Sequence, residues 1–184
     1  MTYKESLAAA MDGLAADPLV CFTGYGLLTG RAAGTLRNVP AAQIIETPVA
    51  ENLMVGLATG LALAGRRPVV FIERFDFILN ALDAIVNHLN AMGKISDGQF
   101  RPAVILRVVA GNHTKPLHTG PTHVQNFTTA VRAMVDFPVV ELGECIGGTL
   151  FAPPLVEIGE KYRRAAERQR AGQSTLLVEH KDLL

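Results

Sequence analysis

The feature of this sequence that most constrains its fold is a series of short apolar segments separated by helical stretches. Residues 19–23, 68–72 and 102–109 are apolar almost throughout and do not alternate with polar residues. Strands of this kind are buried on both faces, and strands that alternate with helices form parallel β-α-β units. The pattern predicts a single α/β domain over residues 1–184. We expect a three-layer sandwich, with about six mainly parallel strands and helices on both faces of the sheet.

The expected elements follow one another without a repeat or a linker. Strands are expected at 19–23, 43–46, 68–72, 102–109, 139–142 and 174–179, and helices at 6–16, 48–64, 78–92, 124–135 and 153–170. Thr47 is a good N-cap for the helix that starts at Pro48, and Gly65 is a good stop. Ligands of parallel sheets bind at the carboxyl ends of the strands. The segments to search for a site are therefore 24–34, 46–51, 73–77 and 110–123.

The charge balance narrows the class of partner. Lys plus Arg number 17 and Asp plus Glu number 17, so the formal net charge is zero. Domains that bind nucleic acid normally carry a basic excess, so nucleic acid is not an expected partner. The chain is 49% hydrophobic and only 18% charged, against a usual charged share of about 25%. Together with Gly56 and Gly60, which leave a smooth face on one helix, the low charge predicts contact with another subunit.

Location is predicted from the cysteines and the apolar runs. Cys21 and Cys145 lie far apart and form no CxxC motif, so we expect two reduced, buried thiols in a cytoplasmic protein. Residues 1–12 have the pattern of an amphipathic helix and not of a signal peptide. The longest apolar run, 53–65, is shorter than the roughly 20 residues that span a bilayer, so no membrane association is expected.

Glu51 is the one ionisable residue in the apolar helix expected after Thr47. By helical spacing it shares a face with Met54, Val55 and Ala58. A helix that is apolar on every side is buried, and a lone carboxylate there loses its hydration. Such a group costs free energy unless it has a partner or a function. Glu51 is therefore either a first-turn capping residue or a group that exchanges a proton with a bound heterocycle.

Two other segments at expected strand ends carry candidate side chains. Residues 24–26 read Gly-Tyr-Gly, but their spacing to Gly30 and Gly34 does not match the dinucleotide motif GxGxxG. A dinucleotide site, an ordinary turn and a loop at another ligand site all stay open. Residues 75–77 read Phe-Asp-Phe. The two aromatic rings belong either to the core or to a wall that stacks on a ligand.

Three histidines, His113, His118 and His123, lie five residues apart in one expected loop. This is not the spacing of a helical ligand pair, and no cysteine or carboxylate supplements it within the loop, so no metal site is expected in this chain. The histidines are either ordinary loop residues or groups that move protons in a pocket.

The sequence resembles a known domain in four segments that occur in order: ETPVAENLMVGLATGLALAGRRPVVF, FDFILNALDAIVN, SDGQFRPAVILRVVAGN and THVQNF. They are similar to the transketolase-like pyrimidine-binding domain of thiamine-diphosphate enzymes. The similarity runs from about Thr23 to the end of the sequence and is greatest to the beta subunit of 2-oxo acid dehydrogenases. The resemblance implies the thiamine-diphosphate-binding fold and thiamine diphosphate as the cofactor.

The resemblance also implies roles for four residues. Glu51 matches the family glutamate that hydrogen-bonds the aminopyrimidine and favours the imino tautomer, which deprotonates the thiazolium carbon. Phe77, with Phe75 nearby, matches the aromatic residue that packs on the pyrimidine face. His123 matches the histidine on the substrate side of the site. Glu51 and His123 are thus the expected catalytic residues, and Glu51, Phe75 and Phe77 the expected cofactor-binding residues.

Some positions depart from the family pattern. Asp76 stands where the beta subunits usually have asparagine. The segment 111–122 differs most, and it would shape the choice of substrate. His113 and His118 in that segment have no family counterpart and remain candidates for the substrate side.

The resemblance implies that this chain is only half of a cofactor site. The diphosphate domain of the family carries a Gly-Asp-Gly motif with an asparagine further on, and the nearest segment here, Ser96-Asp97-Gly98, does not match it. We expect no diphosphate-binding domain and no C-terminal transketolase domain in this chain. A partner subunit would carry the diphosphate domain and bind most of the Mg²⁺. Self-association through the pyrimidine domain would then give a heterotetramer.

The expected function is one half of a split thiamine-diphosphate enzyme that cleaves or forms a carbon–carbon bond next to a carbonyl. The substrate class is a 2-oxo acid, for a dehydrogenase or decarboxylase, or a ketose, for transketolase-type transfer. One alternative is a non-catalytic scaffold or regulatory subunit that kept the fold. Another is a nucleotide-binding α/β protein that uses residues 24–34.

Overall fold

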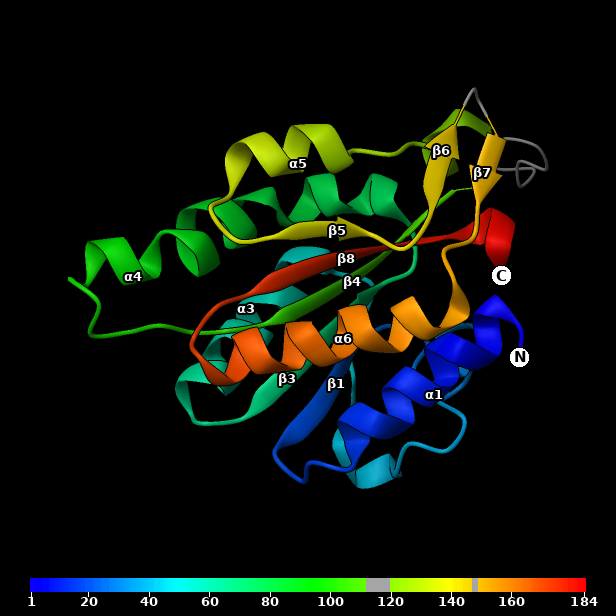
Figure 1. The fold of residues 1–184 in the computed structure, drawn as a ribbon. Helices are drawn as coiled ribbons and strands as arrows, with labels where there is room; N and C mark the ends of the chain where they lie inside the picture. The colour runs from blue at the N-terminus through cyan, green and yellow to red at the C-terminus, as the bar shows by residue number, and fades with distance from the viewer. Residues whose placement is uncertain (112–119, 147–148) are drawn as a thin grey trace.

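The computed structural model describes residues 1–111, 120–146 and 149–184. The strands of its main sheet are β1 (Val20–Gly24), β2 (Ile44–Glu46), β3 (Arg67–Ile72), β4 (Ile105–Ala110), β5 (Val139–Glu141) and β8 (Thr175–His180). They are all parallel and lie in the order β2-β1-β3-β4-β8-β5 (Figure 1). Two further strands, β6 (Glu144–Ile146) and β7 (Thr149–Phe151), form a separate antiparallel pair.

Helices cover both faces of the main sheet, which confirms the predicted fold class (Figure 1). On one face lie α1 (Tyr3–Ala15) and α6 (Leu155–Arg170). On the other lie α3 (Glu51–Leu63), η2 (Phe75–Ala81) and η3 (Asp83–Asn90), with α4 (Met92–Ile95) and α5 (Thr128–Met134) continuing that side. The short helical turns are α2 (Arg31–Gly34), η1 (Ala41–Gln43), η4 (Gly120–His123) and η5 (Lys181–Leu183).

The sheet forms because its strands are apolar on both sides. Every residue of β1, β4 and β8 is buried. Alternate residues of β3 enter the two core clusters, with Phe71 on the side of α1 and α6 and Val70 on the side of α3. Burial of these side chains on both faces is the main force that holds the three layers together.

The start of α3 differs from the prediction. Thr47 does not cap this helix, which begins at Glu51 with Ala50 at its N-cap. The reason is that the Thr47 N–H donates to the Gly24 carbonyl at 2.9 Å and extends the pairing of β2 with β1. The chain therefore runs through four residues after β2 before the helix begins.

The prediction that α3 is buried all round was also wrong for this single chain. Leu53 and Leu63 are about half exposed, and a Cβ added to Gly56 or Gly60 would meet nothing within 4 Å. The inner face is buried as expected. The outer face is apolar and open, which is compatible with contact to another subunit.

Two other local expectations need correction, and one pair of strands was not predicted. The segment 78–92 is not one α-helix: a 3₁₀ segment, a π-helix and a short α-helix follow one another. The helix expected at 124–135 begins only at Thr128, whose N–H donates to the Asn126 side chain at 2.9 Å. The pair of β6 and β7 was not predicted.

A buried ion pair joins β4 to β8. Arg107 and Glu179 are 0% and 1% exposed, and the guanidinium donates to both carboxylate oxygens at 2.8 and 3.1 Å. The Tyr162 hydroxyl also donates to Glu179, and Arg107 donates to Thr35 Oγ1 at 3.1 Å. Burial raises the pKa of Tyr162 well above its ordinary value, so this phenol keeps its proton. The cluster ties the sheet to α6 and to the loop after α2.

Candidate functional site

The strand order places a ligand site between β1 and β3. The chain leaves β1 toward the face covered by α1 and α6, where Leu27 and Leu36 are buried. It leaves β3 toward the opposite face, where Phe75 and Ile78 are buried. Connections that diverge in this way open a crevice at the carboxyl ends of two neighbouring strands.

A cavity of about 100 Å³ lies at this point. It is lined by Tyr25, Val49, Glu51, Met54, Phe71, Ile72, Glu73 and Phe77. These residues come from the ends of β1 and β3, the start of α3 and the start of η2. Three of the four segments that the sequence selected for a site therefore meet at one cavity.

Glu51 is the buried acid of this cavity. It is 6% exposed and is the first residue of α3, at the positive end of the helix dipole. Its Oε2 accepts a hydrogen bond from Asn80 Nδ2 at 3.3 Å. That bond reaches across to η2, whereas the capping alternative required a bond to a first-turn amide. The carboxylate thus lies on a mostly apolar wall with a single amide partner among the described residues.

Phe77 connects this cavity to His123. The half-buried Phe77 lines the cavity, and its ring contacts the His123 ring edge-on, with centroids 5.1 Å apart. The Thr122 hydroxyl lies 3.0 Å from His123 Nδ1. Glu51 and Phe77 are therefore brought together directly, and His123 lies beside Phe77, outside the lining of the cavity.

Residues 75–77 pack against the segment 123–127, and each of the three contacts a different residue of that segment. Phe75 packs edge-on against Phe127, with centroids 6.1 Å apart. Asp76 Oδ1 accepts the Gln125 N–H at 3.4 Å, and Phe77 contacts His123. This segment consequently fixes where His123 lies.

Within this pairing, Phe75 and Asp76 are both buried. Phe75 is fully buried in the core on the α3 side and does not line the cavity. Asp76 is 7% exposed, and its Oδ2 has no hydrogen-bond partner among the described residues. The asparagine that the resemblance leads us to expect at this position would offer an amide hydrogen, whereas aspartate offers only oxygens when ionised.

Gly111 brings the end of β4 against the His123 segment. A Cβ at this position would lie 1.9 Å from the His123 carbonyl oxygen and 2.3 Å from Val124 Cα. Only glycine permits this approach of two backbones. The backbone that carries His123 is thus held from both sides, by Gly111 and by Asp76.

The glycine-rich segment after β1 is organised by a carboxylate. Glu46 accepts the N–H of Gly26 at 2.5 Å and the N–H of Leu28 at 2.7 Å. A phosphate cradle needs free amides of this kind, usually at the start of a long helix, and α2 has only four residues. The geometry therefore favours a loop at another ligand site over a dinucleotide site.

Sequence reasoning missed Asn80 as part of the site, and it selected the segments that contain Tyr25 and Val49 without singling out either side chain. Asn80 is 29 residues from Glu51, and no spacing rule connects them. The candidates His113 and His118 lie outside the described residues. Cys21 is buried and free, as expected. No helix of the described chain has the length and apolar character needed to cross a membrane.

The fold and the cavity define a parallel α/β domain with its site at the switch point between β1 and β3. No protein-family model matches the chain. Curated proteins do. Over 146 residues the chain is 30% identical to the pyruvate dehydrogenase E1 component subunit beta of Rickettsia bellii, which covers 76% of this chain and 44% of that protein.

Two further pyruvate dehydrogenase subunits and one solved structure are also similar to this chain. The mitochondrial pyruvate dehydrogenase E1 subunit beta-2 of Oryza sativa is 32% identical, and the match covers 58% of this chain and 30% of that protein. The pyruvate dehydrogenase E1 subunit beta of Leifsonia xyli is 33% identical, and the match covers 60% of this chain and 34% of that protein. A solved structure described as "Split gene transketolase, inactive beta4 tetramer" superposes with a TM-score of 0.68 and 13% identity. The match covers 97% of this chain and 50% of that one.

The chain belongs to the transketolase-like pyrimidine-binding domains of thiamine-diphosphate enzymes, with relatives among the beta subunits of pyruvate dehydrogenase E1. This confirms the resemblance found in the sequence. The chain spans less than half the length of the curated relatives it matches.

Proposed function

We propose that this chain is the pyrimidine-binding subunit of a split thiamine-diphosphate-dependent enzyme that cleaves or forms a carbon–carbon bond next to a carbonyl. The observation that carries the proposal is that Glu51 and Phe77, matched to family residues by sequence, line one cavity at the switch point. A buried carboxylate opposite an aromatic ring is suited to a flat heterocycle that offers a nitrogen at its edge.

The size of the cavity supports a shared cofactor site. Its volume is about 100 Å³, and a cavity of about 150 Å³ is known to hold a benzene ring. The cavity of this chain alone is smaller than that, so it would enclose at most one ring of the cofactor. The diphosphate end of the cofactor and its Mg²⁺ would be bound mainly by a partner subunit that carries the diphosphate domain.

The residues of this chain would act through position and proton control. Glu51 would hydrogen-bond a ring nitrogen and hold or move a proton there, while Asn80 keeps its carboxylate oriented. Phe77 would pack on the ring face, with Phe75 fixing the start of η2 from the core. Thiamine diphosphate, when bound, supplies the carbanion-stabilising chemistry of the reaction.

His123 would handle protons on the substrate side. A Thr122 hydroxyl that donates to Nδ1 would leave the ring hydrogen on Nε2, which would then be the proton donor. His113 and His118 are proposed for the same side on sequence alone. The substrate class is a 2-oxo acid or a ketose, and the proposed location is the cytoplasm.

Assembly with other subunits is part of the proposal. The split transketolase that shares this fold is described as an inactive tetramer of beta chains. By analogy, this chain would self-associate and become active only as a heterotetramer with its partner. The open apolar face of α3 is a surface suited to the contact.

The test is to isolate the tagged chain from its native lysate with thiamine diphosphate and magnesium present, and to assay the complex with pyruvate and with a ketose donor. Glu51→Gln should lower turnover by about 100-fold or more, because loss of a positioned acid–base group typically costs 10²–10⁴-fold. Glu157→Gln makes the same chemical change on exposed α6 and should leave turnover unchanged.

Each outcome decides between enzyme and scaffold. A partner with the Gly-Asp-Gly motif, and activity that depends on Glu51, would support the split enzyme. Activity of Glu51→Gln equal to that of Glu157→Gln would overturn the role of Glu51. A complex that binds no thiamine diphosphate would leave the scaffold alternative as the better account.

A further inference from the structure

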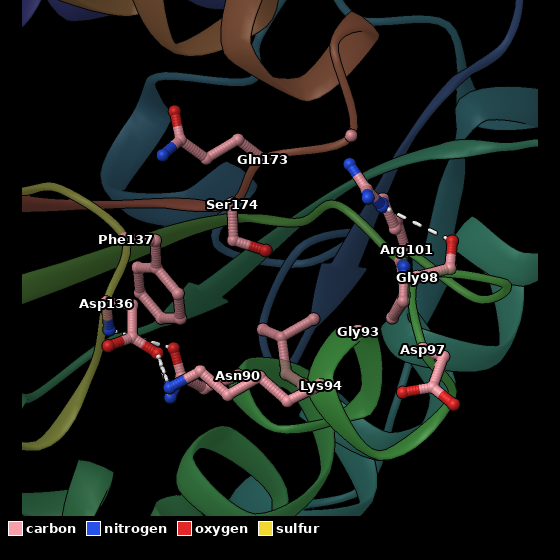
Figure 2. Close-up of a pocket in the computed structure, with 13 residues that line it drawn as sticks. Asn90, Gly93, Lys94, Asp97, Gly98, Arg101, Asp136, Phe137, Gln173 and Ser174 are labelled. Carbon is pink, nitrogen blue, oxygen red and sulfur yellow. Dashed lines mark hydrogen bonds and ion pairs between the residues drawn. The ribbon is translucent and has the colours of Figure 1, made fainter.

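A second and larger cavity lies at the opposite end of the sheet from Glu51. Its volume is about 620 Å³, and it is formed where the chain enters β4, β5 and β8, beside the end of η3 and α4 (Figure 2). The six residues of β4 span about 20 Å, so the length of the sheet separates this cavity from the Glu51 cavity. We call it the Arg101 cavity, after the cation at its edge.

Arg101 presents an unpaired guanidinium to this cavity. The residue is exposed, its Nε donates to the Gly98 carbonyl at 3.3 Å, and it forms no ion pair with any residue that the structure describes. The Nε bond orients the group and leaves its two terminal nitrogens to donate. A guanidinium with this edge open matches the two oxygens of a carboxylate or a phosphoryl group.

Two glycine-containing turns lie against the Arg101 side chain. A Cβ at Gly98 would lie 2.8 Å from Arg101 Nη2, and a Cβ at Gly172 would lie 3.5 Å from Arg101 Cβ. Glycine at 98, with a φ of +78°, therefore provides the room in which the guanidinium lies.

The other walls offer hydrogen-bond donors and an apolar floor. Ser174 Oγ accepts the Val104 N–H at 3.1 Å, so its own hydroxyl hydrogen is available to a ligand. Gln173 lies exposed at the rim, across the cavity from Arg101 (Figure 2). Phe137 and Leu89 are buried beneath.

The electrostatic surroundings favour an anion. Lys94 lines the same cavity, although it pairs with Asp136 at 2.6 Å. A neighbouring cavity of about 230 Å³ shares Arg101 and also contains Arg66, Arg67 and Arg170. Arg67 and Arg170 share one carboxylate, Asp17. Within the Arg101 cavity itself, Lys94 and Arg101 are matched by Asp97 and Asp136. The basic excess that would raise the local concentration of anions therefore comes from the neighbouring cavity.

We propose that the Arg101 cavity binds a small molecule through a carboxylate or phosphoryl group. Arg101 would take the oxyanion, and Ser174 and Gln173 would take polar groups further along the ligand. The volume lies within the range of about 300–1,000 Å³ typical of small-molecule sites. The proposal does not depend on the proposed function, because the Arg101 cavity shares no residue with the Glu51 cavity.

The test is a calorimetric titration of the full chain at low salt, with inorganic pyrophosphate in one arm and citrate in the other. The two arms distinguish a phosphoryl from a carboxylate ligand. Arg101→Gln should weaken binding by about tenfold or more, the typical effect of losing a hydrogen bond to a charged group. Arg37→Gln removes the same charge from an exposed position outside both cavities and should leave affinity unchanged.

A third variant separates charge from geometry. Arg101→Lys keeps the positive charge but loses the paired donors, so its affinity should fall between those of the wild type and Arg101→Gln. Thermal melts without ligand check that each variant folds, and Arg101 is exposed enough for all to do so. No binding of either probe at millimolar concentration would overturn the proposal, as would an equal loss of affinity in Arg37→Gln.

Discussion

Glu51 and Glu179 are both buried glutamates, at 6% and 1% exposed, but their surroundings differ. Glu179 receives two hydrogen bonds from Arg107 and one from Tyr162. Glu51 receives one, at 3.3 Å, from the neutral amide of Asn80, and it lines a cavity. The Glu179 carboxylate is fully engaged by the protein itself, whereas the Glu51 carboxylate keeps oxygen lone pairs for a ligand.

The comparison shows that burial of an acid alone does not identify a functional site. A buried charge is tolerated when it is paired and hydrogen-bonded, and its partner then accounts for it. A buried acid that has one neutral partner and lies beside a cavity costs folding free energy that no structural contact offsets. Proteins keep such groups where function requires them, so substitution should cost much stability at Glu179 and little at Glu51.

The largest effect on stability is expected from breaking the paired region, which is the buried cluster of Arg107, Glu179 and Tyr162. Arg107→Met should destabilise the fold by about 3–5 kcal/mol, because it leaves Glu179 as an uncompensated buried charge. The measurement is chemical denaturation followed by circular dichroism. The double variant Arg107→Met/Glu179→Leu should recover much of this loss, because an apolar pair of similar volume replaces the ions.

The control for this prediction is an exposed ion pair. Arg163 pairs with Glu160 on α6 at 2.7 Å, with both side chains accessible to water. Arg163 also pairs with Glu167. Because all three side chains are exposed, Arg163→Met should cost less than about 1 kcal/mol. If Arg107→Met were as mild as Arg163→Met, the buried pair would not have the structural role given to it here.

The next effect is expected at the backbone contact behind His123. Gly111→Ala should destabilise the fold by about 1–3 kcal/mol, because the new Cβ would overlap the His123 carbonyl and force the two segments apart. The NMR signals of the His123 ring should shift with it. Gly56→Ala is the matched control, since its Cβ enters open space on α3 and the helix gains up to about 1 kcal/mol. A harmless Gly111→Ala would contradict the close approach.

Much of this architecture could be predicted from the sequence because it depends on local patterns. Apolar runs identified the strands, and a lone ionisable residue in an apolar helix identified Glu51. The same signal exists at Arg107, the only charged residue in its strand, and it leads to a structural pair instead of a site. The pattern indicates a buried charge, but it does not show whether the fold supplies a charged partner for it.

The remaining features depend on contacts between residues distant in the sequence. Arg107 and Glu179 are 72 residues apart, and Asn80 is 29 residues from Glu51. The late start of α3 follows from the bond between Thr47 and Gly24, which the capping preference of threonine does not include. Propensity is a weak prior, and tertiary hydrogen bonds override it at such positions.

A smaller effect, dependent on pH, is expected at His180, next to the paired region. Burial lowers the pKa of this histidine below its ordinary value of 6.5, although the carboxylates of Glu141, Asp182 and Glu179 oppose the shift. Between the two pKa values the unfolded chain binds more protons. The stability due to neutral His180 is therefore complete above pH 6.5 and is lost as the pH falls toward the folded pKa.

Denaturation curves at a series of pH values measure this dependence. His180→Gln should flatten the fall in stability just below pH 6.5. The hydrogen bonds that Glu141 receives from Thr128 and Asn126 outweigh its burial and lower its pKa, so its contribution is lost only below about pH 4.5. A wild-type slope in His180→Gln would show that another group is responsible.

The smallest effect on stability is expected at Glu51 itself. Glu51→Gln keeps an oxygen to accept the Asn80 hydrogen bond and removes a buried charge, so stability should change by less than about 1 kcal/mol, in either direction. Glu179→Gln, the same substitution in the paired region, should cost several times more because Arg107 loses its counterion. Denaturation of the two variants side by side compares the regions directly. Equal losses would mean that Glu51 is held for structure. A loss confined to Glu179→Gln would leave function as the reason for a carboxylate at position 51.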